Sequence, residues 1–398
     1  MEAWVPWGTS TTSTKKTLIV ALWSLNTQGM QHVTLDARWQ GLKQCVEKAY
    51  ELAMQEILKQ RSDLGDKPFA LFVAPEYLMA HPDPSGGHVE GSRRHVDEVD
   101  KDTQLQRYIG LSTTCKGMLM VPGTIAWRKP LERSGLDQFH SKPGPLQNQA
   151  KTVSRYDKAI GSLQSYMERR GWGPAYLDWP LSGNLNSGRV APTTRQKLDA
   201  LSTAKVVGPL ARAGFTAWGP DDLRYLARNT AYVLLDGTVL CKYNKQGDFH
   251  EVLVGKDTVH IPGKLDGRFS VKPTNPAQRA IDFGLEICLD HAGQAVEREI
   301  KHLGKVDVHI ITSAQLPTEK ANVATTNTGY VVHASSNKAY TGVWSRGYFG
   351  GLSDVKAIWA EPFLGHPLQL YQIELDLAHV VPTKETVKTV GGSSNWFG

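Results

Sequence analysis

The sequence predicts an α/β protein in which buried strands alternate with amphipathic helices. Strand-like apolar runs occupy residues 17–25, 69–77 and 117–127. Between them, residues 35–60 and 100–114 carry apolar side chains at helical spacing. Because this alternation is typical of sheets that are covered by helices, we expect an α/β sandwich.

The second half of the chain continues the pattern. Residues 228–246 predict a β-hairpin, because two β-rich runs meet at Asp236-Gly237, a dipeptide that suits a tight turn. A helix is expected at 294–303, and further strands are expected at 283–288, 306–314, 330–337 and 370–377.

We interpret the chain as one domain over residues 17–380. A loose, Ser/Thr-rich lead-in of residues 1–16 precedes it, and a polar tail of residues 381–398 follows it. Residues 128–225 are rich in Gly, Pro, Ser and Trp without a clear period, so we expect a long irregular insertion there and not a second domain.

Composition and charge exclude some classes of partner. The 398 residues are 40% hydrophobic and 21% charged with a formal net charge of +6, and basic residues are interspersed with acids. We therefore expect neither a nucleic-acid partner nor, without a long apolar run, a membrane span. Four widely spaced cysteines and no secretory signal favour a cytoplasmic protein, while the lead-in leaves a non-classical export signal open.

The segment IDFGLEICLDHAG (281–293) places Cys288 between a strand and a helical pattern. We expect the sulfur on a sharp turn at a helix N-terminus, where the helix dipole favours the thiolate. The backbone N–H of Leu289 is then available to an oxyanion. The alternative is a buried, inert cysteine.

A nucleophilic cysteine needs a base, and residue type alone leaves several candidates open. Glu76 follows a buried strand in VAPEY, where open sheets present their chemistry, and Lys245 follows the hairpin. Metal binding by His291 with Asp290 is disfavoured because no third ligand is evident, so we expect no metal. The remaining candidates for the base are His250, His291, His333, Glu251 and Glu286.

Three stretches in order resemble the motifs of the nitrilase superfamily, the carbon–nitrogen hydrolases. They are Pro75-Glu76 at the end of a strand, NTAYVLLDGTVLCKYNK with Lys245, and GLEICLD with Cys288. Flanking strands are also similar, so the resemblance covers most of residues 17–380.

This resemblance implies a four-layer α-β-β-α sandwich of the nitrilase type and a Glu–Lys–Cys triad. Cys288 is then the nucleophile, Glu76 the general base and acid, and Lys245 with the Leu289 N–H the oxyanion site. Glu251 is a candidate for a second glutamate that orients the lysine. We expect the substrate pocket to include Tyr77, His291 and Gln315.

The implied activity is hydrolysis of a non-peptide amide or carbamoyl C–N bond through a thioester, without a cofactor. A nitrile is the second candidate substrate, because Leu289-Asp290 resembles the amidase and carbamoylase branches more than true nitrilases. The resemblance also implies a homodimer or a larger homo-oligomer. A different class, a binding or effector protein acting through the insertion, is suggested by Trp172, Trp179 and Trp218.

Overall fold

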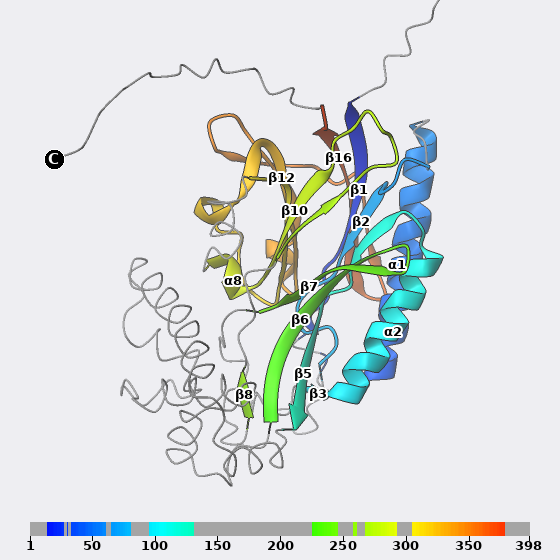
Figure 1. Cartoon of the computed structure of the whole chain (residues 1–398), viewed down its shortest axis with the longest axis vertical. Coiled ribbons are helices and arrows are strands. Elements are labelled where there is room, and N and C mark those ends of the chain that lie inside the picture. The colour runs from blue at the N-terminus through cyan, green and yellow to red at the C-terminus, as the bar shows by residue number, and fades with distance from the viewer. Residues whose placement is uncertain are drawn as a thin grey trace, which may run out of the picture.

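The computed structural model describes residues 14–27, 30, 33–60, 65–80, 95–130, 225–245, 258–260, 267–292 and 305–378. These residues form two sheets, one of ten strands and one of six, that pack face to face (Figure 1). The α/β sandwich predicted from the sequence is confirmed. The body of the expected insertion, the helix expected at 294–303 and the polar tail lie outside the described residues.

Strand β1 (Lys15–Trp23) shows why the apolar runs are continuous rather than alternating. It lies between β2 (Ala70–Val73), which is parallel, and β16 (His366–Asp376), which is antiparallel. Ile19, Ala21 and Trp23 belong to the core under the helices. The intervening residues, among them Val20, belong to the core between the sheets. A strand that is buried on both faces has to be apolar throughout.

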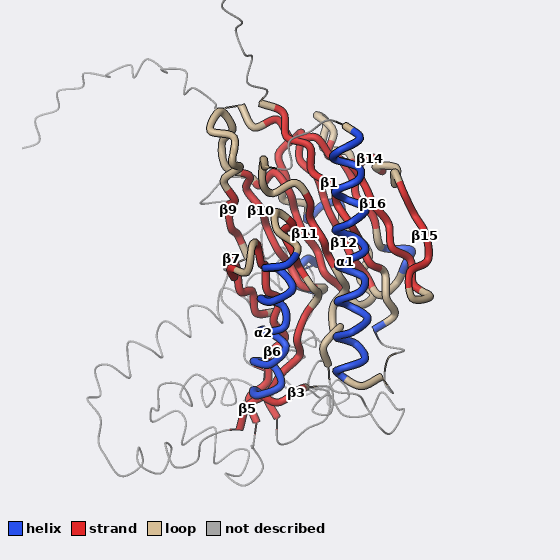
Figure 2. The backbone as a smooth tube through the Cα atoms, turned by 90° about the vertical axis from the view of Figure 1, so that its right-hand side faces the viewer, coloured by secondary structure: helices blue, strands red, loops and turns tan. Residues whose placement is uncertain are grey.

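Helices α1 (Leu35–Lys59) and α2 (Glu98–Thr114) cover the outer face of the ten-stranded sheet (Figure 2). The side chain of Thr34 accepts a hydrogen bond from the Ala37 N–H at 3.2 Å and so caps α1. The buried side chains of α1 recur every three or four residues, as the sequence predicted, from Leu42 to Ile57.

The run expected as one strand at 117–127 forms two strands, which corrects that prediction. β4 (Met118–Val121) ends before Pro122-Gly123, and β5 (Thr124–Pro130) begins after them. Gly123 has φ +76°, a conformation that few other residues adopt, and the pairing with the antiparallel strand Tyr225–Leu235 is interrupted there and shifts by one residue.

The expected hairpin is present as β6 (Tyr225–Leu235) and β7 (Thr238–Asn244), and it joins the ten-stranded sheet. Asp236 and Gly237 form its turn with φ +50° and +81°. The other strands of this sheet are β3 (Val96–Asp97), β8 (Thr258–His260) and β15 (Trp359–Phe363).

The six-stranded sheet centres on two parallel strands, β10 (Ile281–Ile287) and β11 (Val306–Ser313). Leu285, Ile287 and Ile310 face the core between the sheets. Strands alternate their side chains, so Glu286 and His309 face outward. The sheet is completed by β9 (Arg268–Val271), β12 (Thr325–Ser335), β13 (Gly342–Arg346) and β14 (Leu352–Asp354).

Short helices complete the described fold. α8 (Leu289–Ala292) follows β10, and the turns η3 (Lys320–Asn322) and η4 (Lys338–Tyr340) flank β12. No helix within the described residues combines the length and the apolar character that a membrane span requires.

Candidate active site

Glu76 lies in a turn three residues beyond β2 and is completely buried. Its backbone N–H donates to the carbonyl oxygen of Ser313 at 3.3 Å. Its carbonyl oxygen accepts a hydrogen bond from Thr27 Oγ1 at 2.8 Å. Ser313 belongs to the six-stranded sheet and Thr27 follows β1 of the ten-stranded sheet, so hydrogen bonds from both sides hold the turn. The carboxylate lies between the ends of β2 and β11.

Lys245 follows β7 directly and points to the same place. Its ammonium nitrogen Nζ lies 2.7 Å from Glu76 Oε1, and its side chain is 2% exposed. Its backbone N–H donates to the carbonyl oxygen of Asn229 at 2.9 Å. The ammonium group also lies 5.7 Å from the centre of the Tyr77 ring. A buried charge needs a partner, and Glu76 supplies it.

Cys288 forms the elbow between β10 and α8, as the sequence predicted. Its φ is +49°, which is unusual for a residue with a side chain. Its backbone N–H donates to Thr312 O at 2.8 Å, and its carbonyl oxygen accepts from the His291 N–H at 2.9 Å. These bonds hold the elbow on the end of the parallel strand pair.

The protonation state of Cys288 differs from the expectation. Burial first, and then the negative charge of Glu76, raise the pKa of its thiol to about 12. The positive charge of Lys245 and a hydrogen bond from the backbone of Ala314 lower the pKa by less. The expected thiolate is therefore wrong, because burial and a neighbouring carboxylate outweigh any effect of the short helix α8. The sulfur is therefore a thiol beside the Glu76 carboxylate.

Two further groups bind the Glu76 carboxylate, and the sequence interpretation missed both. Asn229 Nδ2 donates to Oε1 at 2.9 Å, and the Ala314 N–H donates to Oε2 at 3.0 Å. Asn229 precedes the hairpin turn in RNTAYVLL, where a buried asparagine among strand residues is a usable signal. A backbone donor such as Ala314 leaves no signature in residue type.

The residues next to the motifs differ in burial and in contacts. Asp290 is buried and accepts a hydrogen bond from the hydroxyl of Tyr243 at 2.8 Å, which ties the lysine and cysteine motifs together. Tyr77 is half-buried beside Lys245, and Gln315 is exposed on the loop after Ala314. Leu289 begins α8 directly after Cys288.

His291 does not present a free ring nitrogen to a substrate, which corrects its place in the expected pocket. Its ring is completely buried and both ring nitrogens bind protein groups, Glu286 and the Glu319 N–H. His250 and Glu251, the other candidates near the lysine, lie outside the described residues.

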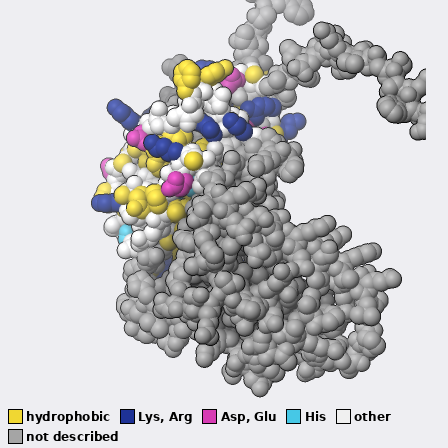
Figure 3. Space-filling view, turned by 90° about the vertical axis from the view of Figure 1, so that its left-hand side faces the viewer, with side chains coloured by type: hydrophobic (Ala, Val, Ile, Leu, Met, Phe, Trp, Pro, Cys, Tyr) yellow, Lys and Arg dark blue, Asp and Glu magenta, His cyan; other side chains and the backbone are white. Residues whose placement is uncertain are grey.

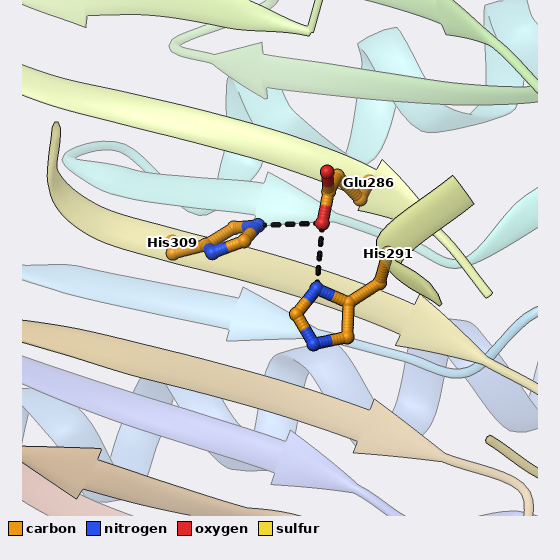
Figure 4. A group of neighbouring side chains, drawn as sticks. All are labelled: Glu286, His291 and His309. Carbon is orange, nitrogen blue, oxygen red and sulfur yellow. Dashed lines mark hydrogen bonds and ion pairs between the residues drawn. The ribbon is translucent and has the colours of Figure 1, made fainter. Parts of the chain in front are cut away.

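Glu286, His291 and His309 form a second buried cluster, on the outer face of the six-stranded sheet (Figure 4). His291 Nδ1 and His309 Nε2 lie 2.7 Å and 2.8 Å from the same oxygen, Glu286 Oε2. Burial raises the pKa of Glu286, but His309 and then His291 outweigh it and bring the pKa to about 2. Glu286 is therefore an anion that the histidines stabilise, and it is not a base for Cys288.

His333, another candidate base, is buried nearby. Ser313 Oγ lies 2.7 Å from its Nε2, and Thr318 Oγ1 lies 2.8 Å from its Nδ1. Burial and the two neighbouring histidines hold its pKa well below the usual value. Both ring nitrogens of His333 therefore already have partners, one at the end of β11 and one in the loop that follows it.

A cavity of about 570 Å³ lies at the opposite end of β1 from these groups. Its wall includes Lys16, which pairs with Asp66 at 2.8 Å. None of the candidate residues that the structure describes lines this cavity, so it is separate from the group of Glu76, Lys245 and Cys288. On the face in Figure 3, Lys and Arg side chains are spread among hydrophobic and uncharged ones over the described residues.

No protein-family model and no curated protein matches the chain. Among solved structures, it is similar to a glutamine-dependent NAD(+) synthetase from Cytophaga hutchinsonii, with a TM-score of 0.35 and 8% sequence identity. The similarity covers 91% of this chain and 43% of that one. A similarity this low does not indicate an activity, so any functional inference depends on the geometry around Glu76, Lys245 and Cys288.

Proposed function

We propose that the protein is a thiol hydrolase that cleaves a non-peptide C–N bond, with an amide or carbamoyl compound as substrate. One observation carries the proposal: Glu76, Lys245 and Cys288 come from distant segments and meet in one buried place. The motif resemblance to the nitrilase superfamily supports the same chemistry. No metal or organic cofactor is needed for it.

In the first half of the proposed reaction, Glu76 takes the proton of the Cys288 thiol as the sulfur attacks the carbonyl carbon. A thiol with a pKa of about 12 is a weak nucleophile near neutral pH, so the adjacent carboxylate has to act as the base. Lys245 and the Leu289 N–H stabilise the oxyanion that forms.

The tetrahedral intermediate then collapses. Glu76 gives its proton to the leaving nitrogen, the C–N bond breaks, and ammonia or an amine departs. A thioester on Cys288 remains. In the second half, Glu76 removes a proton from water, which attacks the thioester and releases the acid, and the thiol regains its proton. Each group therefore returns to its starting state.

Asn229 favours an amide over a nitrile as substrate. Its Nδ2 donates to Glu76, whereas its Oδ1 is buried without a hydrogen-bond donor among the described residues. Leaving a buried acceptor unpaired costs about 1–3 kcal/mol. The N–H of an amide can supply the missing donor beside the base, and a nitrile nitrogen cannot.

We also propose that the protein acts as a homodimer or a larger homo-oligomer, since the resembled family assembles in this way. Light scattering of the purified protein would measure the mass in solution directly. A mass equal to one chain would contradict this part of the proposal without affecting the chemistry.

The test of the activity is ammonia release from a panel of amides, carbamoyl amino acids and nitriles, with wild-type protein and the Cys288→Ala variant. We expect release from at least one amide or carbamoyl compound by wild type and none by the variant, with unchanged thermal unfolding. Equal release by both proteins would refute the proposal. Release from nitriles alone would refute the assignment of an amide substrate.

A further inference from the structure

The cluster in Figure 4 has a fixed arrangement of protons, which follows from its backbone neighbours. The Glu319 N–H donates to His291 Nε2 at 3.1 Å, and the Ala324 N–H donates to His309 Nδ1 at 3.3 Å. A nitrogen that accepts a hydrogen bond carries no proton, so each ring holds its proton on the other nitrogen. Both of those N–H groups point at Glu286 Oε2.

This arrangement disfavours a metal ion, although a glutamate and two histidines are a common ligand set. The two histidine nitrogens lie 2.7 Å and 2.8 Å from Glu286 Oε2, closer than the separation of about 3.3 Å that tetrahedral bonds of about 2.0–2.1 Å impose between two ligand atoms. In addition, a ligating histidine donates from its other nitrogen, and here both other nitrogens face N–H groups.

The network touches the proposed active site from two directions. Through its backbone, His291 donates to the carbonyl oxygen of Cys288 at 2.9 Å. Through its ring, it accepts from Glu319 at the far end of the loop that follows β11. The near end of that loop supplies the Ala314 N–H to Glu76.

His333 holds the same loop between those ends. Its ring binds the side chains of Ser313 and Thr318, which bracket Ala314 and the exposed Gln315. The backbone carbonyl of Ser313 also accepts the N–H of Glu76. The position of the carboxylate is thus linked to a loop that two buried histidines hold in place.

We propose that His291 is a positioning residue, which holds the loop of residues 314–319 against the Cys288 elbow so that the Ala314 N–H, the Glu76 carboxylate and the thiol stay in register. Glu286 and His309 serve it by fixing the proton on Nδ1, which leaves Nε2 as the acceptor for Glu319. This inference rests on the proposed function of Cys288 and deepens it.

The sharpest test removes the N–H donor at position 319, because proline has the ring Cδ in place of the amide hydrogen that faces His291 Nε2. Glu319 has φ −80° and ψ +104°, a conformation that proline adopts, and its side chain is exposed. Glu319→Pro deletes the donor to His291, whereas the matched Glu319→Ala variant deletes only the side chain. We expect kcat to fall about tenfold or more in the proline variant, with KM changed less than about threefold, and no change in the alanine variant.

A second pair of variants changes the ring instead of the donor. In the His291→Gln variant, the side-chain amide oxygen can take the place of Nε2 and accept the Glu319 N–H. In His291→Ala, the side chain has no acceptor. We expect glutamine to restore most of the kcat that alanine loses. Equal kcat in wild type, Glu319→Pro and His291→Ala would overturn the inference. One tightly bound metal ion per wild-type chain, lost in His291→Ala, would also overturn it.

A readout without substrate keeps this inference separate from the proposed function. The rate at which iodoacetamide labels Cys288, followed by peptide mass spectrometry, reports the surroundings of the thiol even if no hydrolysis is found. If the labelling rate changes at least about threefold in Glu319→Pro but not in Glu319→Ala, this result supports the inference without depending on the proposed function. Labelling and turnover that are both unchanged in Glu319→Pro refute it, while wild-type turnover keeps the proposed function standing.

Discussion

At the scale of single residues, the site is built around one buried carboxylate with every oxygen occupied. Lys245 and Asn229 bind one oxygen of Glu76, and the Ala314 N–H binds the other. Hydrogen bonds to a carboxylate favour its ionised form, which a general base requires. The neighbouring thiol keeps its proton near neutral pH, because burial and that same carboxylate raise its pKa.

Lys245 is expected to contribute to both stability and catalysis. Lys245→Ala should lower kcat by a factor of about 10²–10³, as loss of one preorganised oxyanion group does. It should also destabilise the fold by about 3–5 kcal/mol, because the charge of Glu76 is left buried and unpaired. Steady-state kinetics and urea unfolding measure the two effects. Lys242→Ala, at an exposed lysine of β7 three residues before Lys245, is the control and should change neither.

A double variant separates the two effects. Glu76→Gln with Lys245→Met removes both charges together, so we expect most of the lost stability to return while activity stays absent. If the double variant regained turnover, the carboxylate and the ammonium group would have no part in the chemistry.

Residue type predicted the principal groups here but not their full environment. Glu76, Lys245 and Cys288 could be proposed from motif order, and the structure brings the three side chains together. The Ala314 N–H could not, because any residue provides a backbone donor. The buried position of His291 was also missed, since a histidine in the sequence after Cys288 gives no sign of whether it faces a pocket or the protein interior.

At the scale of elements, the Glu76 turn is held by its neighbours in space. Arg38 of α1 donates to the carbonyl oxygens of Tyr77 and Leu78 at 3.4 Å and 3.3 Å. On the other side, Gly123 packs directly on the turn, where an added Cβ would lie 2.3 Å from Pro75 O. The break between β4 and β5, which the sequence interpretation missed, is what makes room for the turn.

Gly123→Ala should therefore damage the site as well as the fold. A methyl group at this place has to displace the Pro75 carbonyl, and alanine disfavours φ +76°. We expect kcat to fall at least about tenfold, measured on protein that circular dichroism shows to be folded. Gly350→Ala is the matched control, because its φ is +81° but nothing lies within 4 Å of the added Cβ. It should lose about 1 kcal/mol of stability and no activity, and a similar loss of activity in both variants would contradict the role of this contact.

At the scale of the whole molecule, strong periodicity made the core predictable. The apolar runs around Val20 and Ile310 are buried on a sheet, and α1 begins and ends within one residue of the expected range. Which strands share a sheet could not be read from local pattern. The segment 342–346 and the short β9 pair with strands adjacent to them in the sequence, β12 and β10, and neither strand was expected, because their short runs carry no clear alternation.

The stability of the molecule in acid should depend on the cluster outside the active site. The pKa of Glu286 falls from 4.5 to about 2 on folding, so its contribution is complete above about pH 4.5 and is lost as the pH falls towards 2. The contribution is on the order of 3 kcal/mol. Urea unfolding of wild type and Glu286→Gln at pH 7 and pH 3 measures it, and we expect the difference between them to shrink in acid. Glu374→Gln on the surface is the control, and a difference that does not change with pH would contradict this linkage.

The most direct test of the central claim is to trap the thioester. Wild-type protein turning over an amide is quenched in acid, digested and mapped by mass spectrometry. We expect the acyl part of the substrate, without its leaving nitrogen, to be attached to the peptide that contains Cys288 and to be removed by hydroxylamine. Peptides with Cys45, Cys115 and Cys241 should carry none. Turnover without any acyl group on Cys288, together with an active Cys288→Ala variant, would contradict the account.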